Sequence, residues 1–201
     1  SIYLAKTFRC RATGITITDN QVDQAYKKAE KAGVSHLTDF YRMDFENTSF
    51  QDNTFSVVWG LESICYAQSK EDFLKEAFRV LKDRGRVIVA DGFASRREYQ
   101  GKDAKLMQRW LDGWIVNHLN TGEEFREFTE RIGYTKSEYT DVTDYVKKTS
   151  WIMFLVSLPF LPLHIIDQFI RIKQYPTDAL FHQYFAMRKK LWEYGIFYAE
   201  K

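Results

Sequence analysis

The chain has 201 residues, a length typical of a single domain with a substantial core. Its net charge of +2 argues against a nucleic-acid-binding protein, because such binding needs a basic surface. The two cysteines, Cys10 and Cys65, are too few for a disulfide framework or a metal cluster, so we expect no bound metal and a cytoplasmic location.

The first half of the chain predicts alternating helices and strands, the pattern of an α/β protein. Residues 1–6 read as a helix with no start signal before them. Short apolar runs rich in β-branched residues predict strands at 12–17, 38–43, 55–59 and 86–91. Apolar residues at helical spacing predict helices at 21–33 and 70–82.

The rest of the chain is rich in aromatic residues and no longer alternates regularly between helices and strands. A helix is predicted over 105–119, with Trp110 and Trp114 on one face. Thr121 and Glu124 form the sequence pattern of a capping box, which predicts that a helix starts there. Further strands are predicted at 136–143 and 193–200.

A long insertion lies between these last two strands and contains the nearly continuous apolar stretch 151–166. The stretch is shorter than the roughly 20 residues that span a bilayer, and Pro159 and Pro162 interrupt it, so we do not expect a transmembrane helix. It is either a helical cap packed on the sheet, or a lid that buries a lipophilic ligand or dips into a membrane surface. We favour the lipophilic pocket, with peripheral membrane contact left open.

Four segments of the chain stand out in order and spacing: GITITDNQ, RMDFENTSFQDNTFSVVWGLESICY, FLKEAFRVLKDRGRVIVADGF and YGIFYAEK. Together they resemble the class I S-adenosylmethionine-dependent methyltransferases, in the branch of sterol, tocopherol and sarcosine methyltransferases and cyclopropane synthases. The resemblance implies a Rossmann-like, doubly wound α/β sheet, mostly parallel with an antiparallel terminal strand and a helical cap insertion. It also implies S-adenosylmethionine as cofactor.

The resemblance further implies that Ser1 lies just beyond the family's first strand and glycine-rich loop. We therefore expect residues 1–201 to be a single methyltransferase domain that lacks this central strand, with cap elements at 93–120 and 144–192. A sheet without its central strand leaves two ladders of unpaired backbone groups, so we expect this segment not to fold independently.

Ligands of doubly wound sheets bind beyond the carboxyl ends of the strands, which points to residues 16–21, 44–45, 60–66 and 91–93. The resemblance implies that Thr16, Ile17, Thr18 and Gln21 contact the cofactor around its ribose. It implies that Asp44 accepts from the adenine amino group while Phe45 packs on the base. It places Gly60, Leu61 and Glu62 beside the cofactor. The alternative for these residues is local capping and loop structure.

Three residues are candidates for catalysis. Glu62 follows a buried strand, where it could act as a general base or stabilise a cation, or merely organise its loop. Tyr66 could line the methyl-transfer site or pack in the core. His118, one and two turns beyond Trp114 and Trp110, could face the acceptor or be structural.

The sequence therefore predicts methyl transfer from S-adenosylmethionine to a small, lipophilic acceptor such as a prenylated ring, a sterol-like lipid or an alkaloid. A small amine such as sarcosine is the alternative within the same enzyme class. A catalytically silent lipid-binding module is another alternative. A nicotinamide dehydrogenase is disfavoured by Thr16, because such folds place an acid at that strand end. The oligomeric state is not predicted.

Overall fold

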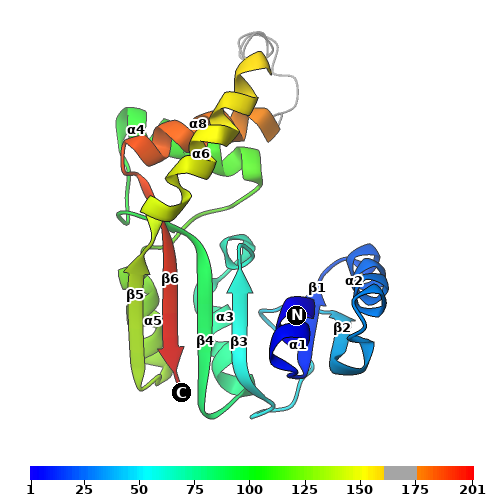
Figure 1. The fold of residues 1–201 in the computed structure, drawn as a ribbon. Coiled ribbons are helices and arrows are strands. Elements are labelled where there is room, and N and C mark those ends of the chain that lie inside the picture. The colour runs from blue at the N-terminus through cyan, green and yellow to red at the C-terminus, as the bar shows by residue number, and fades with distance from the viewer. Residues whose placement is uncertain (161–175) are drawn as a thin grey trace. The chain divides into compact units, whose positions relative to one another are not determined.

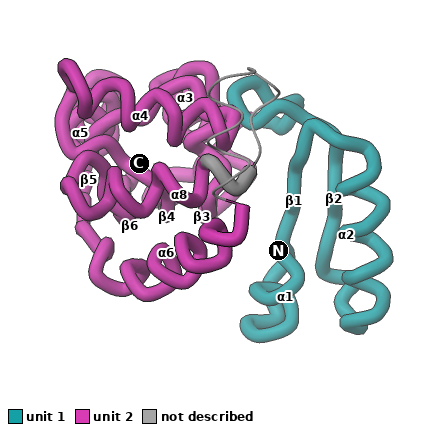
Figure 2. Tube along the Cα trace, turned by 90° about the horizontal axis from the view of Figure 1, so that it is seen from above, with its two compact units in different colours: residues 1–51 teal, residues 52–201 magenta. Residues whose placement is uncertain are grey.

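The structure is a computed structural model that describes residues 1–160 and 176–201. The chain divides into two compact units, residues 1–51 and residues 52–201 (Figure 2). Their strands form two sheets, and no ladder joins the sheets among the described strands. The expected α/β fold, with parallel strand pairs and an antiparallel terminal strand, is confirmed by these sheets.

The first unit contains a two-stranded parallel sheet. Its elements are α1 (Ile2–Phe8), β1 (Ala12–Thr16), α2 (Asp19–Lys31), the 3₁₀ turn η1 (Ser35–Leu37) and β2 (Thr38–Arg42). The two strands pair so that Ile15 lies opposite Tyr41. A small core of Ala5, Ala29 and Phe40 joins the two helices to the sheet. The parallel pairing brings the carboxyl ends of both strands to the same edge.

The second unit contains a four-stranded mixed sheet in the order β3-β4-β6-β5 (Figure 1). Its strands are β3 (Phe55–Leu61), β4 (Leu81–Ala94), β5 (Lys136–Asp141) and β6 (Trp192–Glu200). Its helices and turns are η2 (Ile64–Tyr66), α3 (Lys70–Val80), α4 (Gly101–Trp114), α5 (Gly122–Ile132), α6 (Thr143–Ser157), η3 (Leu158–Phe160) and α8 (Pro176–Arg188). β3 and β4 are parallel, whereas β6 is antiparallel to both of its neighbours, which confirms the antiparallel terminal strand.

The predicted capping box starts α5. The amide of Glu124 donates to the hydroxyl of Thr121 at 3.1 Å, and the amide of Thr121 donates back to the Glu124 carboxylate at 2.8 Å. α5 and α3 lie beside each other and against the sheet (Figure 1). The buried rings of Phe93, Phe125 and Phe197 form the core between sheet and helices. This packing fixes the strand ends from which the site is built.

A helical cap formed by α4, α6 and α8 stands at the carboxyl ends of β3 and β4 (Figure 1). Its core includes Trp110, which stacks on Trp192 with 4.6 Å between ring centroids. Residues 161–166 of the apolar stretch lie outside the described residues. None of the described helices is long and apolar enough to cross a membrane.

The helix predicted over 105–119 is wrong at its C-terminal end. α4 stops at Trp114, because Ile115 adopts the left-handed conformation with φ 58° and caps the helix. His118 therefore lies in the loop after α4 and does not share a helical face with Trp110 and Trp114. Trp110 is buried in the cap core, so its ring is not a surface for the acceptor.

Candidate functional site

The end of β1 carries a cluster of polar side chains. The hydroxyls of Thr16 and Thr18 lie 3.2 Å apart, and the Thr16 hydroxyl also donates to the side-chain oxygen of Gln21. These groups are at or near the surface, at the start of α2. Hydroxyls and an amide held together at a strand end are suited to bind the hydroxyls of a sugar.

The neighbouring strand end, beyond β2, carries Asp44 and Phe45. The Asp44 carboxylate accepts a 2.9 Å hydrogen bond from the amide of Glu46, which fixes the turn, and Asp44 is exposed while Phe45 is half-buried. Ile17 is exposed, and its carbonyl accepts a 3.2 Å hydrogen bond from Arg42. The first unit thus brings all its predicted site residues to one edge of its sheet.

In the second unit, β3 ends in Gly60 and Leu61. A Cβ on Gly60 would lie 2.4 Å from the Ile64 side chain, so glycine is already required by its own following loop. Close approach of a ligand is therefore not needed to explain this glycine. Leu61 is exposed beside it.

Glu62 is the first residue beyond β3, and its backbone is strained. It has φ 48°, a left-handed conformation that costs a non-glycine residue about 1–2 kcal/mol. Its amide donates to the carbonyl of Ala90 at 2.9 Å, so the strand pairing holds it in place. Strained residues cluster at functional sites, so this geometry supports Glu62 as a candidate.

The Glu62 carboxylate is positioned by Tyr194 on β6. The Tyr194 hydroxyl donates to Oε1 of Glu62 at 2.9 Å. Burial raises the pKa of Tyr194, and the hydrogen bond to Glu62 raises it further, so the phenol stays protonated and remains the donor. Partial desolvation of the phenol, followed by the charges of Cys65, Asp91 and Glu62, also raises the pKa of Tyr66. Tyr66 is exposed at the end of η2.

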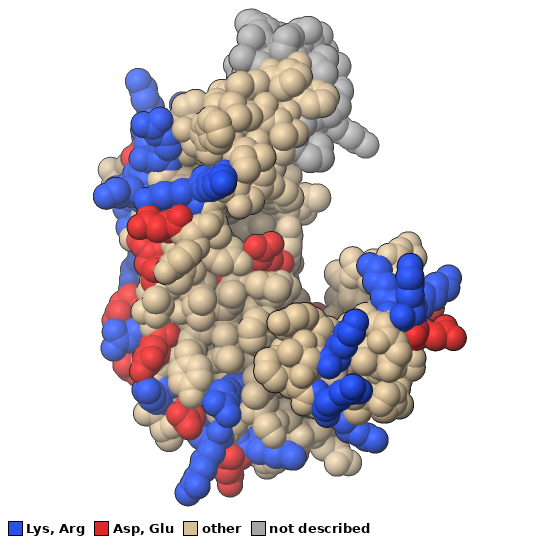
Figure 3. All heavy atoms as spheres, in the orientation of Figure 1, with Lys and Arg blue, Asp and Glu red and all other residues tan. Residues whose placement is uncertain are grey.

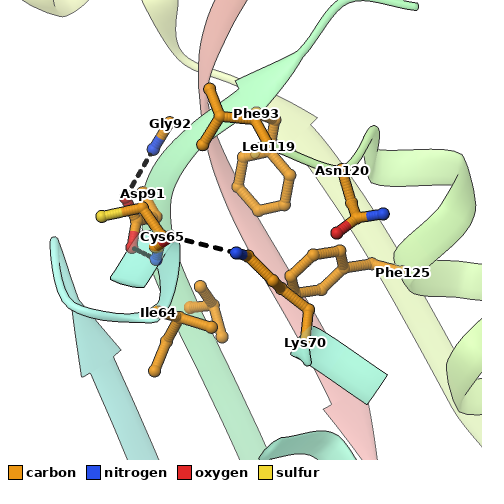
Figure 4. Close-up of a pocket in the computed structure, with 10 residues that line it drawn as sticks. Ile64, Cys65, Lys70, Asp91, Gly92, Phe93, Leu119, Asn120 and Phe125 are labelled. Carbon is orange, nitrogen blue, oxygen red and sulfur yellow. Dashed lines mark hydrogen bonds between the residues drawn. The ribbon is translucent and has the colours of Figure 1, made fainter. Parts of the chain in front are cut away.

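A buried polar cluster supports the loop that carries Glu62 and Tyr66 (Figure 4). The Asp91 carboxylate accepts from the amides of Cys65 at 2.9 Å and Gly92 at 2.8 Å. The Lys70 ammonium donates to the carbonyls of Cys65 at 3.0 Å and Ala67 at 2.8 Å. Burial raises the pKa of both the Asp91 carboxyl and the Cys65 thiol. Asp91 and Lys70 thereby clamp η2 from the sheet side and from α3.

The cavity within this cluster is not a ligand site. It measures about 10 Å³ and is lined in part by Ile64, Phe93 and Leu119. A space of that size admits at most about one water molecule. No group of three or more His, Cys, Asp or Glu side chains suited to a metal occurs within the described ranges.

His118 lies in the loop between α4 and α5. Partial burial lowers its pKa, and the positive charge of Lys70 lowers it further, so the imidazole is biased toward its neutral form. A neutral imidazole can accept a proton. Its catalytic role stays a prediction.

Sequence reasoning missed Tyr194 and Lys70 and named Asp91 only as part of a strand end. Tyr194 belongs to the predicted last strand, but its approach to Glu62 depends on the register that places Gly92 opposite Tyr194. The signal that could have found it is that an antiparallel strand starts at the edge where its parallel neighbours end.

Comparison with known proteins bears on the family and the fold of the chain. A family model for a methyltransferase domain matches residues 1–89. The glycine/sarcosine/dimethylglycine N-methyltransferase of Actinopolyspora halophila is 29% identical over 146 residues, which are 72% of this chain and 25% of that protein. Sterol methyltransferase-like 3 of Botryococcus braunii is 30% identical over 137 residues, which are 65% of this chain and 34% of that protein.

A solved structure of geranyl diphosphate methyltransferase in complex with S-adenosylmethionine has the same fold. It superposes with a TM-score of 0.77 at 17% identity, covering 99% of this chain and 72% of that one. The chain thus spans a quarter to a third of the length of the two curated relatives. With its strand order, its terminal strand and its matching segments, the chain belongs to the class I S-adenosylmethionine-dependent methyltransferase family.

Proposed function

We propose that the protein transfers a methyl group from S-adenosylmethionine to a small lipophilic acceptor, with Glu62 as the central catalytic residue. The observation that carries this proposal is the Glu62 carboxylate, held at the end of β3 by strained backbone and by the 2.9 Å bond from Tyr194. Other described residues, such as Arg84 and Lys190, have the same left-handed backbone, so it is the bond from Tyr194 that distinguishes Glu62.

The first unit offers groups that fit the adenosine part of the donor. The hydroxyls of Thr16 and Thr18 and the amide of Gln21 would hold the ribose hydroxyls, and Ile17 borders them. Asp44 would accept from the adenine amino group, with the Phe45 ring on the base. In the second unit, Gly60, Leu61 and Glu62 are proposed to border the donor, following the family resemblance.

S-Adenosylmethionine supplies an electrophilic methyl group on a sulfonium, so the protein need only align the acceptor, exclude water and manage charge. Oε1 of Glu62 is occupied by Tyr194, whereas Oε2 makes no further hydrogen bond within the described part of the chain. Oε2 can therefore take the proton that the acceptor gives up, or stabilise positive charge that develops on the acceptor. Tyr66 offers its ring face to the same charge.

A lipophilic acceptor is favoured by the side chains around Glu62. Its exposed neighbours in the chain, Leu61 and Tyr66, present an aliphatic group and an aromatic ring. Each apolar side chain that an acceptor buries contributes about 1.5–3 kcal/mol. A prenylated ring, a sterol-like lipid or an alkaloid would gain from such contacts, whereas a small amine such as sarcosine would lose hydration without replacement.

The test is transfer of a labelled methyl group from S-adenosylmethionine by the full chain to a panel of prenylated, steroidal, alkaloid and small-amine acceptors. We expect label in a lipophilic acceptor. Transfer to sarcosine alone would keep the reaction class and overturn the acceptor class. Donor binding by calorimetry without transfer to any acceptor would favour the silent lipid-binding module instead.

A further inference from the structure

The cap helix α6 exposes several apolar side chains on its outer side, although two serines are buried on its inner side. The residues turned toward the protein include Ser150 and Ser157, which are 4% and 0% exposed. The Ser150 hydroxyl is buried without a hydrogen-bond partner in the structure, whereas that of Ser157 donates to the carbonyl of Phe154. A surface helix normally buries its apolar stripe and exposes its polar residues.

The opposite side of the helix, the outer face of α6, is formed by Tyr145, Lys148, Trp151, Ile152, Leu155 and Val156. These positions fall on one side because the helix repeats every 3.6 residues. Trp151, Ile152 and Val156 are 48%, 46% and 56% exposed. The turn that follows continues the apolar surface with Leu158 and Phe160. Adjacent exposed apolar residues of this kind mark an interaction surface.

The inner face is nevertheless well anchored. The Phe154 ring stacks on the ring of Tyr184 in α8, with 4.4 Å between the ring centroids. Its centroid also lies 5.6 Å from those of Phe181 and Phe185. α6 is therefore held in this rotation by aromatic packing, and its outer face is presented to the surroundings.

The charges near this face are predominantly basic. Lys147 and Lys148 lie in its first half, and from residue 145 to residue 160 the chain has no acidic residue. Lys147 forms an ion pair with Asp144 at the start of α6, and this hydrogen bond and charge, followed by the charge of Lys190, lower the pKa of Asp144. Lys148 is exposed, α8 ends at the exposed Arg188, and Lys189 and Lys190 follow it. Figure 3 shows an uncharged surface over α6 with Lys and Arg along one side of it. Apolar residues bordered by basic ones are the pattern of helices that lie in the surface of an anionic membrane.

We propose that the outer face of α6 docks on the surface of an anionic phospholipid bilayer. Trp151, Ile152 and Val156 enter the boundary between headgroups and acyl chains, and the lysines contact the phosphates. Membrane binding is a property separate from methyl transfer, and it is measured without any methyl donor or acceptor. A failure to bind membranes can therefore be distinguished from a failure of the proposed function.

The test is sedimentation of the full chain with vesicles of phosphatidylcholine alone and with about one-third phosphatidylserine. We expect binding that strengthens with phosphatidylserine and weakens with salt. The double variant Ile152→Gln, Val156→Gln should lower the partition coefficient by about tenfold or more. Lys148→Gln should lower it by about fivefold on the anionic vesicles only.

The matched control is Ile115→Asn, which removes an apolar side chain that is 84% exposed but lies at the C-cap of α4, away from the outer face of α6. Asparagine tolerates the left-handed conformation of that position, so the fold is kept. Partition of this variant should equal that of the wild type. Brominated lipids should quench tryptophan fluorescence in the wild type, and the quenching should fall in Trp151→Phe.

Three results would overturn the proposal. One is absence of binding to either vesicle. Another is binding that the double variant does not weaken. The third is a dimer that the double variant dissociates while lipid binding is absent, since the outer face of α6 would then join two copies of the chain.

Discussion

The hydroxyl of Tyr194 donates a 2.9 Å hydrogen bond to Oε1 of Glu62, which joins the start of β6 to the end of β3. The backbone of Tyr194 is fixed in turn. Its amide donates to the Thr143 hydroxyl at 2.9 Å, and its carbonyl accepts from the Val142 amide at 2.8 Å. The residue that orients Glu62 is therefore also the residue to which the first turn of α6 is attached. Tyr194 thus holds the Glu62 carboxylate through its side chain and the start of α6 through its backbone.

Removal of the Tyr194 hydroxyl should slow methyl transfer without weakening the binding of S-adenosylmethionine. We expect Tyr194→Phe to lower kcat by about tenfold, because an unheld carboxylate spends less time in the productive orientation. Tyr198→Phe is the matched control, since that hydroxyl lies on the same strand and bonds Glu200 at 3.2 Å. Steady-state kinetics and donor calorimetry on both variants give the answer, and equal kcat values in the two would remove the positioning role.

The strained backbone of Glu62 should lower the stability of the folded protein, so a substitution that relieves the strain should stabilise it. Glu62→Gly should raise the free energy of unfolding by about 0.5–1 kcal/mol, because relief of left-handed strain outweighs the added chain entropy of glycine. Glu62→Ala keeps the strain and should show no such gain. Urea unfolding of the two variants measures the difference. A glycine variant no more stable than the alanine variant would show that the φ of 48° carries no cost.

The sequence was sufficient to predict a strand at each of these places, because buried strands are short apolar runs. It did not predict their limits, since β3 continues to Leu61 and β4 runs from Leu81 to Ala94. It could not give the contact between Tyr194 and Glu62, which depends on the pairing register of strands far apart in the chain. The end of α4 was missed because Ile115 takes a left-handed conformation that isoleucine rarely adopts. The composition of α6 indicated an apolar helix, but which side faces outward follows from its packing on α8.

Asp91 should make stability depend on pH. Burial raises its pKa in the folded state, so between the ordinary value of about 3.9 and the raised value the native state binds more protons than the unfolded state. Stability contributed by the protonated form is therefore lost as pH rises through this window. The variant Asp91→Asn lacks this titration. The free energy of unfolding of the wild type minus that of the variant should therefore be larger at pH 4.5 than at pH 8. Urea unfolding at the two values measures it, and a difference that grows with pH would refute the assignment.

Asp44 should govern affinity for the donor. Asp44→Ala is expected to weaken binding of S-adenosylmethionine by about 5- to 150-fold, the consequence of leaving a hydrogen-bonding group of the base unpaired. Asp39→Ala removes an exposed acid from β2 and should leave affinity unchanged. Calorimetry with S-adenosylmethionine compares the two. Unchanged affinity in Asp44→Ala would exclude the proposed contact with adenine.

Glu62→Gln tests the central claim most directly, because glutamine keeps the size of the side chain and an oxygen for Tyr194 but cannot take a proton or carry charge. The measurement is single-turnover methyl transfer with the donor bound in advance, alongside calorimetry of donor binding. We predict that the rate falls by about 10²–10⁴-fold while the Kd for S-adenosylmethionine changes by less than about twofold. A Glu62→Gln variant that transfers the methyl group at the wild-type rate would contradict the account.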